Sequence, residues 1–133
     1  MKTKRFAKTL LYFGPLILWM GVIFYFSAQE GSGHRYYDLR MFIERKGAHI
    51  FEYLILTLLG MRMLKYLNKP LGKSFVYAAL LSLIYAASDE FHQLFVYGRE
   101  GKLFDVGIDS IGIAMALLIY SGWMFCQRKK EEK

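Results

Sequence analysis

Cysteine is nearly absent from this chain: Cys126, close to the C-terminus, is the single cysteine among 133 residues. One cysteine excludes a disulfide framework and a cysteine-rich metal site. The sequence also lacks a repeat with a period of about 20–50 residues, which excludes a repeat array. Charge is missing from long stretches, and hydrophobic residues make up 55% and aromatic residues 17% of the chain. This composition is rich for a soluble protein of this length.

The charged residues are mostly basic, with 18 Lys and Arg against 11 Asp and Glu and a formal net charge of +7. The cations flank apolar segments and do not alternate with aromatic residues on one face, which argues against nucleic-acid binding. Cations beside apolar segments are typical of membrane proteins whose loops contact anionic headgroups.

Four apolar segments are each about as long as the 20 or so residues that a helix needs to cross the hydrocarbon core. The predicted spans cover about residues 10–28, 46–66, 74–96 and 104–125. The first is too long for a typical signal peptide and lacks a clean cleavage site, so we expect a retained span. Pro15 lies near its expected start, where a missing N–H is tolerated.

The segment from Gln29 to Arg45 is polar, and its glycines are expected to break the helix. Its second half, YYDLRMFIER (36–45), predicts either a short interfacial segment or a plain connecting loop. Together these patterns predict an all-α, polytopic integral membrane protein, with four transmembrane helices bundled in a single domain over residues 1–133.

The Lys and Arg residues also predict an orientation. Twelve of them lie in the N-terminal segment, the second connection and the C-terminal tail, against six in the first and third connections. Because cytoplasmic segments carry the excess of Lys and Arg, both termini are expected in the cytoplasm.

With this orientation, most polar residues of the spans fall at the external face, where the second and fourth helices begin and the third ends. An Asp or Lys at a bilayer centre costs about 2.5–3.5 kcal/mol, so ionisable groups beside membrane-length segments indicate a functional site. Ser27 and Gln29 belong to the same face. The candidate ligand-binding residues are Lys46, His49, Glu52, Tyr53, Asp89, Glu90, His92, Gln93, Arg99, Asp105 and Asp109.

At about 100° per residue, these side chains form stripes on their helices. Lys46, His49 and Tyr53 share one stripe of the second helix, with Glu52 further around it. On the third helix Asp89, His92 and Gln93 share a face, with Glu90 beside it. On the fourth, Asp105 and Asp109 continue into Gly112 and Ala116, small residues that let membrane helices approach closely. We expect a polar crevice that opens outward.

Each residue also has a plainer explanation. Lys46 and Arg99 can extend to lipid headgroups, as is expected of Lys102 and Arg45. His49 can share one hydrogen bond with a neighbouring helix, and Asp109 can be a structural partner of Arg99. Trp19, Tyr97 and Trp123 are explained as interfacial or packing residues.

Two segments carry a family resemblance. They are RKGAHIFEYLIL (45–56) and SDEFHQLFVYGREGKLFDVGIDSIG (88–112). Together they resemble the VanZ-like family of small bacterial membrane proteins. The matching positions are Lys46, His49 and Tyr53, then Asp89, Glu90, His92 and Gln93, then Gly98 and Arg99, then Asp105, Asp109 and Gly112. Tyr97 departs from the pattern, because proline often precedes the G-R pair.

The resemblance covers nearly the whole chain and implies a multi-pass protein of the bacterial cytoplasmic membrane with a role in the cell envelope. The family takes its name from a protein associated with low-level resistance to teicoplanin, a lipid-tailed glycopeptide. The expected partners are membrane lipids and a lipid-linked cell-wall precursor or lipoglycopeptide. The resemblance supplies no settled biochemical activity.

Four hypotheses for the polar residues remain open. The first is a headgroup site in which Arg99 and Lys46 hold phosphate or carboxylate while acids and amides bind hydroxyls. The second is a membrane-embedded hydrolase or transferase, in which His49 and His92 act as general acid and base beside carboxylates. The candidate catalytic residues are His49, His92, Asp89 and Glu90.

The third hypothesis is a metal-binding helix bundle, because His49-x-x-Glu52 and Asp89-x-x-His92 resemble the pairs of di-metal bundles. Lys46 and Arg99 argue against it unless they turn away, so no metal or other cofactor is predicted. The fourth, a transporter, is ranked low because no inverted repeat is visible.

Overall fold

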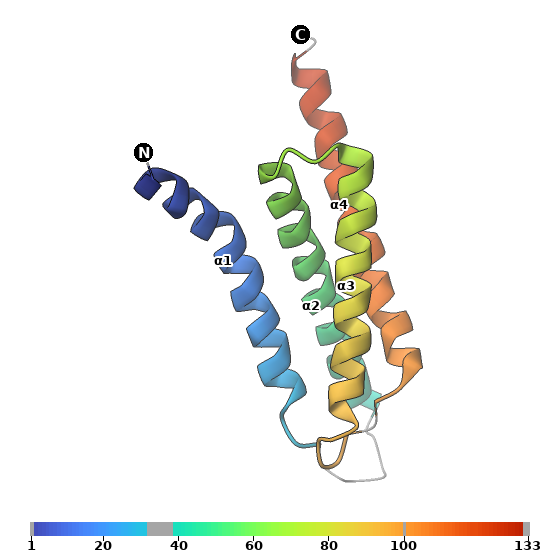
Figure 1. The fold of residues 1–133 in the computed structure, drawn as a ribbon. Coiled ribbons are helices and arrows are strands. Elements are labelled where there is room, and N and C mark those ends of the chain that lie inside the picture. Colours follow the sequence, from blue (N-terminus) through green and yellow to red (C-terminus); the bar gives the residue numbers. More distant parts are fainter. Residues whose placement is uncertain (1, 32–38, 100, 132–133) are drawn as a thin grey trace.

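The computed structural model describes residues 2–31, 39–99 and 101–131, and within these ranges the chain is helical without a strand (Figure 1). Four helices follow one another: α1 (Lys2–Ser27), α2 (Leu39–Tyr66), α3 (Leu71–Gln93) and α4 (Leu103–Glu131). The prediction of an all-α protein with four helices is confirmed.

Each of the four helices is long and apolar enough to cross a membrane. Their outer surfaces carry many large apolar side chains, for example Leu18, Ile84 and Leu118, which are 71%, 66% and 73% exposed. Soluble monomers rarely expose apolar surface this extensive. The fold therefore places its large apolar side chains where lipid covers them.

The helix boundaries differ from the predicted spans. Helix α1 begins at Lys2 and not near Leu10, so Pro15 lies in the helix interior. Because proline has no N–H, the carbonyl four residues earlier lacks its helical donor, and such sites bend helices. Figure 1 shows that α1 bends and that its N-terminal half leans away from the other helices.

Helix α2 begins at Leu39, so the predicted interfacial segment or loop is already helical from this residue; residues 32–38 lie outside the described part. Helix α3 ends at Gln93, three residues before the predicted end at Val96. There the backbone N–H groups of Leu94, Phe95 and Val96 bond carbonyls three residues back, which tightens the chain into turns.

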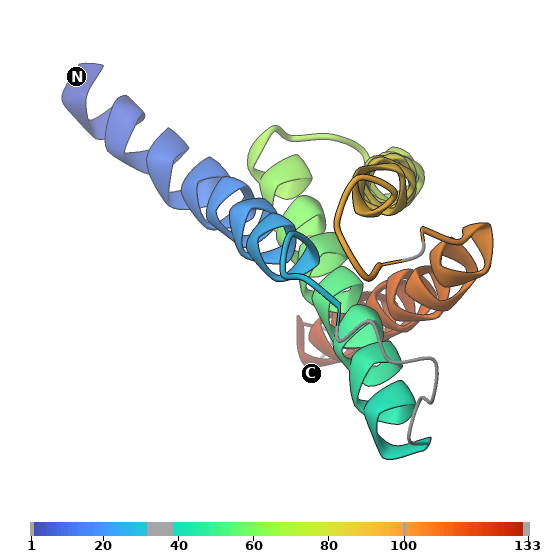
Figure 2. The same ribbon diagram turned by 90° about the horizontal axis from the view of Figure 1, so that it is seen from below.

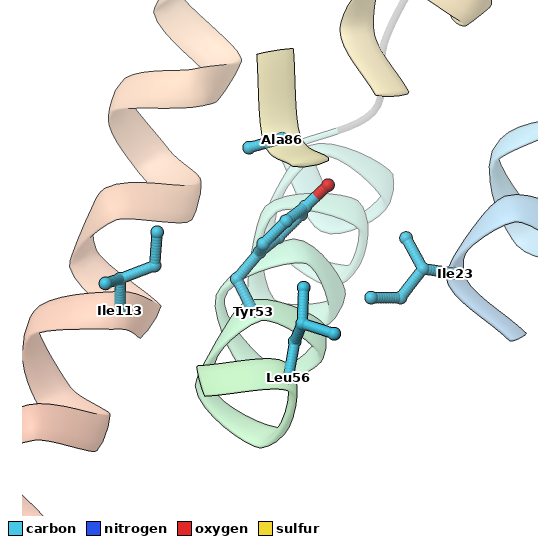
Figure 3. Close-up of a cluster of buried hydrophobic side chains, with 5 residues drawn as sticks. All are labelled: Ile23, Tyr53, Leu56, Ala86 and Ile113. Atoms are coloured by element: carbon cyan, nitrogen blue, oxygen red, sulfur yellow. The ribbon is translucent and has the colours of Figure 1, made fainter. Parts of the chain in front are cut away.

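Helix α2 is the central element and packs against all three other helices (Figure 2). Its buried Tyr53 and Leu56 meet Ile23 of α1, Ala86 of α3 and Ile113 of α4 (Figure 3). A second apolar cluster forms around Met61, Met63, Leu64 and Ala78 towards the other end of the bundle.

Small and polar residues make up the buried face of α3. Its buried residues are Ser74, Ala78, Ser82, Ala86, Asp89, Glu90 and Gln93. The Thr57 hydroxyl of α2 donates a 2.9 Å hydrogen bond to the Ser82 hydroxyl. Membrane helices associate through small residues and polar contacts of this kind, because apolar side chains gain little by leaving lipid.

Two loops dock on each other at the end of the bundle where α1 and α3 end. The Gly31 N–H donates to the Tyr97 carbonyl over 3.0 Å. A Cβ on Gly31 would lie 1.8 Å from the Gly98 carbonyl oxygen, and Gly98 itself has a φ of +71°. Glycine is needed at both positions because the backbones touch and because other residues rarely adopt this φ. The docking holds together the helix ends that carry the polar residues.

Candidate functional site

The candidate residues lie at one end of the bundle, which we call the site end. It is formed by the C-termini of α1 and α3, the N-termini of α2 and α4, and the loop between α3 and α4 (Figure 1). Because successive helices run in opposite directions, these four helix ends lie at the same end of the bundle (Figure 1).

Two polar pairs connect α2 to α4. The Lys46 ammonium forms an ion pair with Asp105. One turn further along both helices, His49 Nδ1 lies 3.0 Å from Asp109 Oδ1. Lys46 and His49 are three residues apart and Asp105 and Asp109 four, so both pairs come from matching faces.

Helix α3 contributes two buried acids and an amide between them. The Gln93 amide nitrogen donates to Asp89 Oδ2 over 3.2 Å and to Glu90 Oε1 over 3.4 Å. The second oxygen of Glu90 accepts a 2.9 Å hydrogen bond from the Lys102 backbone N–H. These bonds fix both carboxylates towards the interior.

Arg99 turns towards the end of α1. Its Nε donates to the Gln29 carbonyl over 2.9 Å and its Nη2 to the Phe26 carbonyl over 3.0 Å. Carbonyls at a helix C-terminus lack helical donors, and the guanidinium supplies donors to two carbonyls there, although the Phe26 carbonyl also accepts the Gln29 N–H over 3.3 Å. The pKa of Arg99 is lowered, first by burial and then by the nearby Arg45 charge. The guanidinium nevertheless stays charged at neutral pH.

A cavity of about 310 Å³ opens between α1, α2, α3 and the loop that carries Arg99. It is lined by Phe26, Ser27, Gln29, Arg45, Ala48, His49, Glu52, Asp89 and Arg99. Two carboxylates and a histidine face a space large enough for part of a small polar group.

His92 and Tyr53 do not join this cavity. The His92 ring lies 4.5 Å from the Phe24 ring, between α3 and α1. Tyr53 is fully buried in the apolar core beneath the site, with its ring 6.5 Å from that of Tyr85. The structure therefore separates the two histidines: His49 lies beside the Asp109 carboxylate, whereas His92 lies against Phe24.

Several buried polar atoms of the site end lack a hydrogen-bond partner within the described ranges. They are Ser27 Oγ, Tyr53 OH, Asp89 Oδ1, His92 Nε2 and Asp109 Oδ2. Buried polar atoms in native proteins are almost always paired. Ser27 and Asp89 line the cavity, so their unpaired oxygens indicate that the cavity has binding capacity.

Sequence reasoning missed several supporting contacts. Trp19, interpreted as an interfacial or packing residue, donates from Nε1 to the Glu52 carbonyl over 2.9 Å and ties α1 to α2 beside the cavity. Arg45, expected to extend to headgroups, lines the cavity together with Ala48. The spacing of aromatic residues along α1 shows which of them share a face. It does not show which face turns towards α2, so it could not predict the Trp19 contact.

A larger cavity of about 690 Å³ lies towards the opposite end of the bundle. It is lined by Tyr12, Leu58, Arg62, Lys65, Tyr66, Asn68, Ile119, Tyr120 and Trp123. None of these lining residues is an acid, whereas Glu52 and Asp89 line the cavity at the site end.

The fold and the site define a multi-pass membrane protein with a buried, acid-rich polar site at one end of its helix bundle. The chain belongs to the VanZ/LLP1 family, whose sequence model matches residues 12–125. The resemblance found in the motifs is thereby confirmed. No curated protein matches the chain. No solved structure matches it either.

Proposed function

We propose that this protein works in the envelope of the bacterial cytoplasmic membrane and binds the headgroup of an amphiphile at its external face. The amphiphile is a lipid-linked envelope component or a lipoglycopeptide of the teicoplanin type. The observation that carries the proposal is the cavity lined by His49, Glu52 and Asp89 between membrane-spanning helices. A ligand with a lipid tail can keep the tail in the bilayer while its headgroup enters this cavity.

The contacts of the two cations favour a headgroup rich in hydroxyl, amide or amine groups. Lys46 is paired with Asp105 and does not line the cavity, while Arg99, which lines it together with Arg45, uses its Nε and Nη2 on backbone carbonyls. Glu52 and Asp89 instead offer acceptor oxygens, which bind hydroxyl and amine donors. The first hypothesis drawn from the sequence, a headgroup site, is therefore kept. Its principal contacts are now the acids and not the cations.

Binding is favoured over catalysis because the described residues place no activated nucleophile beside the cavity: the Ser27 hydroxyl lines it but has no hydrogen-bond partner within the described ranges. The Ser88 hydroxyl is exposed and donates to the Tyr85 carbonyl over 2.7 Å. The proximity of His49 and Asp109 would suit acid–base chemistry, but His92, the second expected participant, lies against Phe24.

The test is protection of a teicoplanin-susceptible bacterium that expresses the chain. We expect the chain to raise the inhibitory concentration, and Glu52→Gln or Asp89→Asn to return it to the value of the host. The matched control is Glu30→Gln, which changes an exposed acid just beyond α1 that does not line the cavity. Membrane extracts must show equal amounts of each variant. Full protection by both cavity variants, or none by the native chain, contradicts the proposal.

A further inference from the structure

Three ionisable side chains from three helices meet beside the cavity. They are His49 of α2, Glu90 of α3 and Asp109 of α4, and one donor atom of each lies within 4.8 Å of the other two. Glu90 and Asp109 are buried, with 4% and 0% of their surfaces exposed. Two ionised carboxylates this close in a low-dielectric interior repel each other, and the repulsion is relieved when one of them binds a proton or when a cation lies between them.

The hydrogen bonds of these acids leave part of the negative charge uncompensated. Glu90 accepts from neutral donors, the Lys102 backbone N–H and the Gln93 amide. Asp109 Oδ1 lies 3.0 Å from His49, while its buried Oδ2 has no partner within the part of the chain that the structure describes. An unpaired carboxylate oxygen in a fully buried side chain is a free ligand position.

The cations that argue against a metal are held by other groups. Lys46 bonds Asp105, and Arg99 bonds the carbonyls of Phe26 and Gln29 at the end of α1. The sequence pattern pointed to His49 with Glu52 and to Asp89 with His92, pairs within single helices. The structure instead brings together one residue from each of three helices, which is the arrangement of metal sites in helix bundles.

We propose that His49, Glu90 and Asp109 bind a divalent transition-metal ion, with zinc as the reference ion. Zinc takes one imidazole nitrogen and carboxylate oxygens at about 2.0–2.2 Å, and three protein ligands leave a fourth position open. Carboxylate ligands are themselves oriented by hydrogen bonds in metal sites, and the Lys102 N–H and Gln93 amide do this for Glu90. The proposed site adjoins the cavity, because His49 belongs to both.

The experiment is a titration of the purified full chain in detergent with zinc alone, measured by competition with a chromophoric chelator and by elemental analysis. We expect one zinc per chain. Glu90→Gln and Asp109→Asn keep the shape of each side chain but remove the charge and replace one acceptor oxygen by an NH2 donor. Each should weaken zinc binding by about tenfold or more, and so should His49→Ala.

Two matched controls come from the same chain. His92→Ala removes a histidine that lies against Phe24, and Glu30→Gln removes an exposed acid just beyond α1. Both should bind zinc as the native chain does. Circular dichroism in detergent verifies that each variant is folded, and because the Gln and Asn variants are nearly isosteric, they keep the test valid should His49→Ala unfold.

Absence of stoichiometric zinc contradicts the metal site. So does zinc binding that the three ligand variants leave unchanged, or that His92→Ala weakens as strongly, because the ion is then bound elsewhere. The titration contains no lipid or antibiotic. A chain that binds zinc but gives no teicoplanin protection therefore refutes the proposed function alone, and the reverse result refutes the metal site alone.

Discussion

Arg99 shows how one side chain can connect two distant parts of the chain. Its guanidinium donates through two different nitrogens to the carbonyls of Phe26 and Gln29, 73 and 70 residues away. Lysine has a single ammonium group on a flexible stem and does not reproduce this fork. The residue holds the end of α1 against the loop that follows α3.

The Arg99→Lys variant should therefore loosen the end of α1 while the rest of the bundle stays intact. Hydrogen bonds from charged donors contribute about 1.5–3 kcal/mol each, so we expect a loss of about 1–3 kcal/mol in local stability. Hydrogen exchange by mass spectrometry should show faster exchange in peptides that cover residues 24–31. The control is Arg128→Lys in the last turn of α4. Unchanged exchange in Arg99→Lys would show that the fork does not hold α1.

At the scale of the helices, the distance between α2 and α4 depends on Gly112. A Cβ on this residue would lie 2.1 Å from the Ile50 carbonyl oxygen and 3.1 Å from the Leu54 nitrogen, both backbone atoms of α2. Since backbone cannot rotate away, any side chain here forces the two helices apart. The pairs Lys46–Asp105 and His49–Asp109 bridge the same two helices and would lengthen.

Gly112→Ala should destabilise the bundle by about 1–3 kcal/mol, the usual cost of overpacking. Gly107→Ala on the same helix is the matched control, because a Cβ there meets nothing within 4 Å. That variant should be neutral or more stable by up to about 1 kcal/mol, because alanine favours helix over glycine. Unfolding in mixed detergent micelles, followed by circular dichroism, measures both. Equal stability of the two variants would contradict the close contact between α2 and α4.

For the whole molecule, the distribution of Lys and Arg predicts that the site end faces outward. Tyr97 lies in the loop at the site end and Lys69 in the turn between α2 and α3 at the other end, and both are exposed. The two positions therefore report on opposite sides of the membrane.

The orientation is tested with single-cysteine variants in a Cys126→Ser background. In intact cells, a membrane-impermeant maleimide should label the Tyr97→Cys variant. It should label the Lys69→Cys variant only after permeabilisation. The reverse pattern would place the site at the cytoplasmic face and would overturn an external headgroup as its ligand.

The sequence alone was sufficient for the class of fold. Backbone groups cannot remain unpaired in lipid, so an apolar segment of membrane length has little choice but to be a helix. Four such segments run alternately in opposite directions, so the first and third connections lie at the same end of the bundle. The positions of Lys46, His49, Asp89, Asp105 and Asp109 relative to the segment ends place these residues at one end without knowledge of packing. The motifs around them were also specific enough to indicate the family that the comparison with family models confirmed.

The partners of these residues were decided only by the tertiary structure. Periodicity shows which residues share a face of a helix, but not which neighbouring helix that face contacts. The contact depends on how the helix is rotated, and this is set by close approaches such as the one between Gly112 and Ile50. For this reason the sequence left open whether Asp109 lies beside Arg99 or beside a histidine. In the structure it lies beside His49, and His92 lies against Phe24 instead of joining the acids. The proximity of His49, Glu90 and Asp109 follows from the packing of three helices, and helical periodicity contains no information about it.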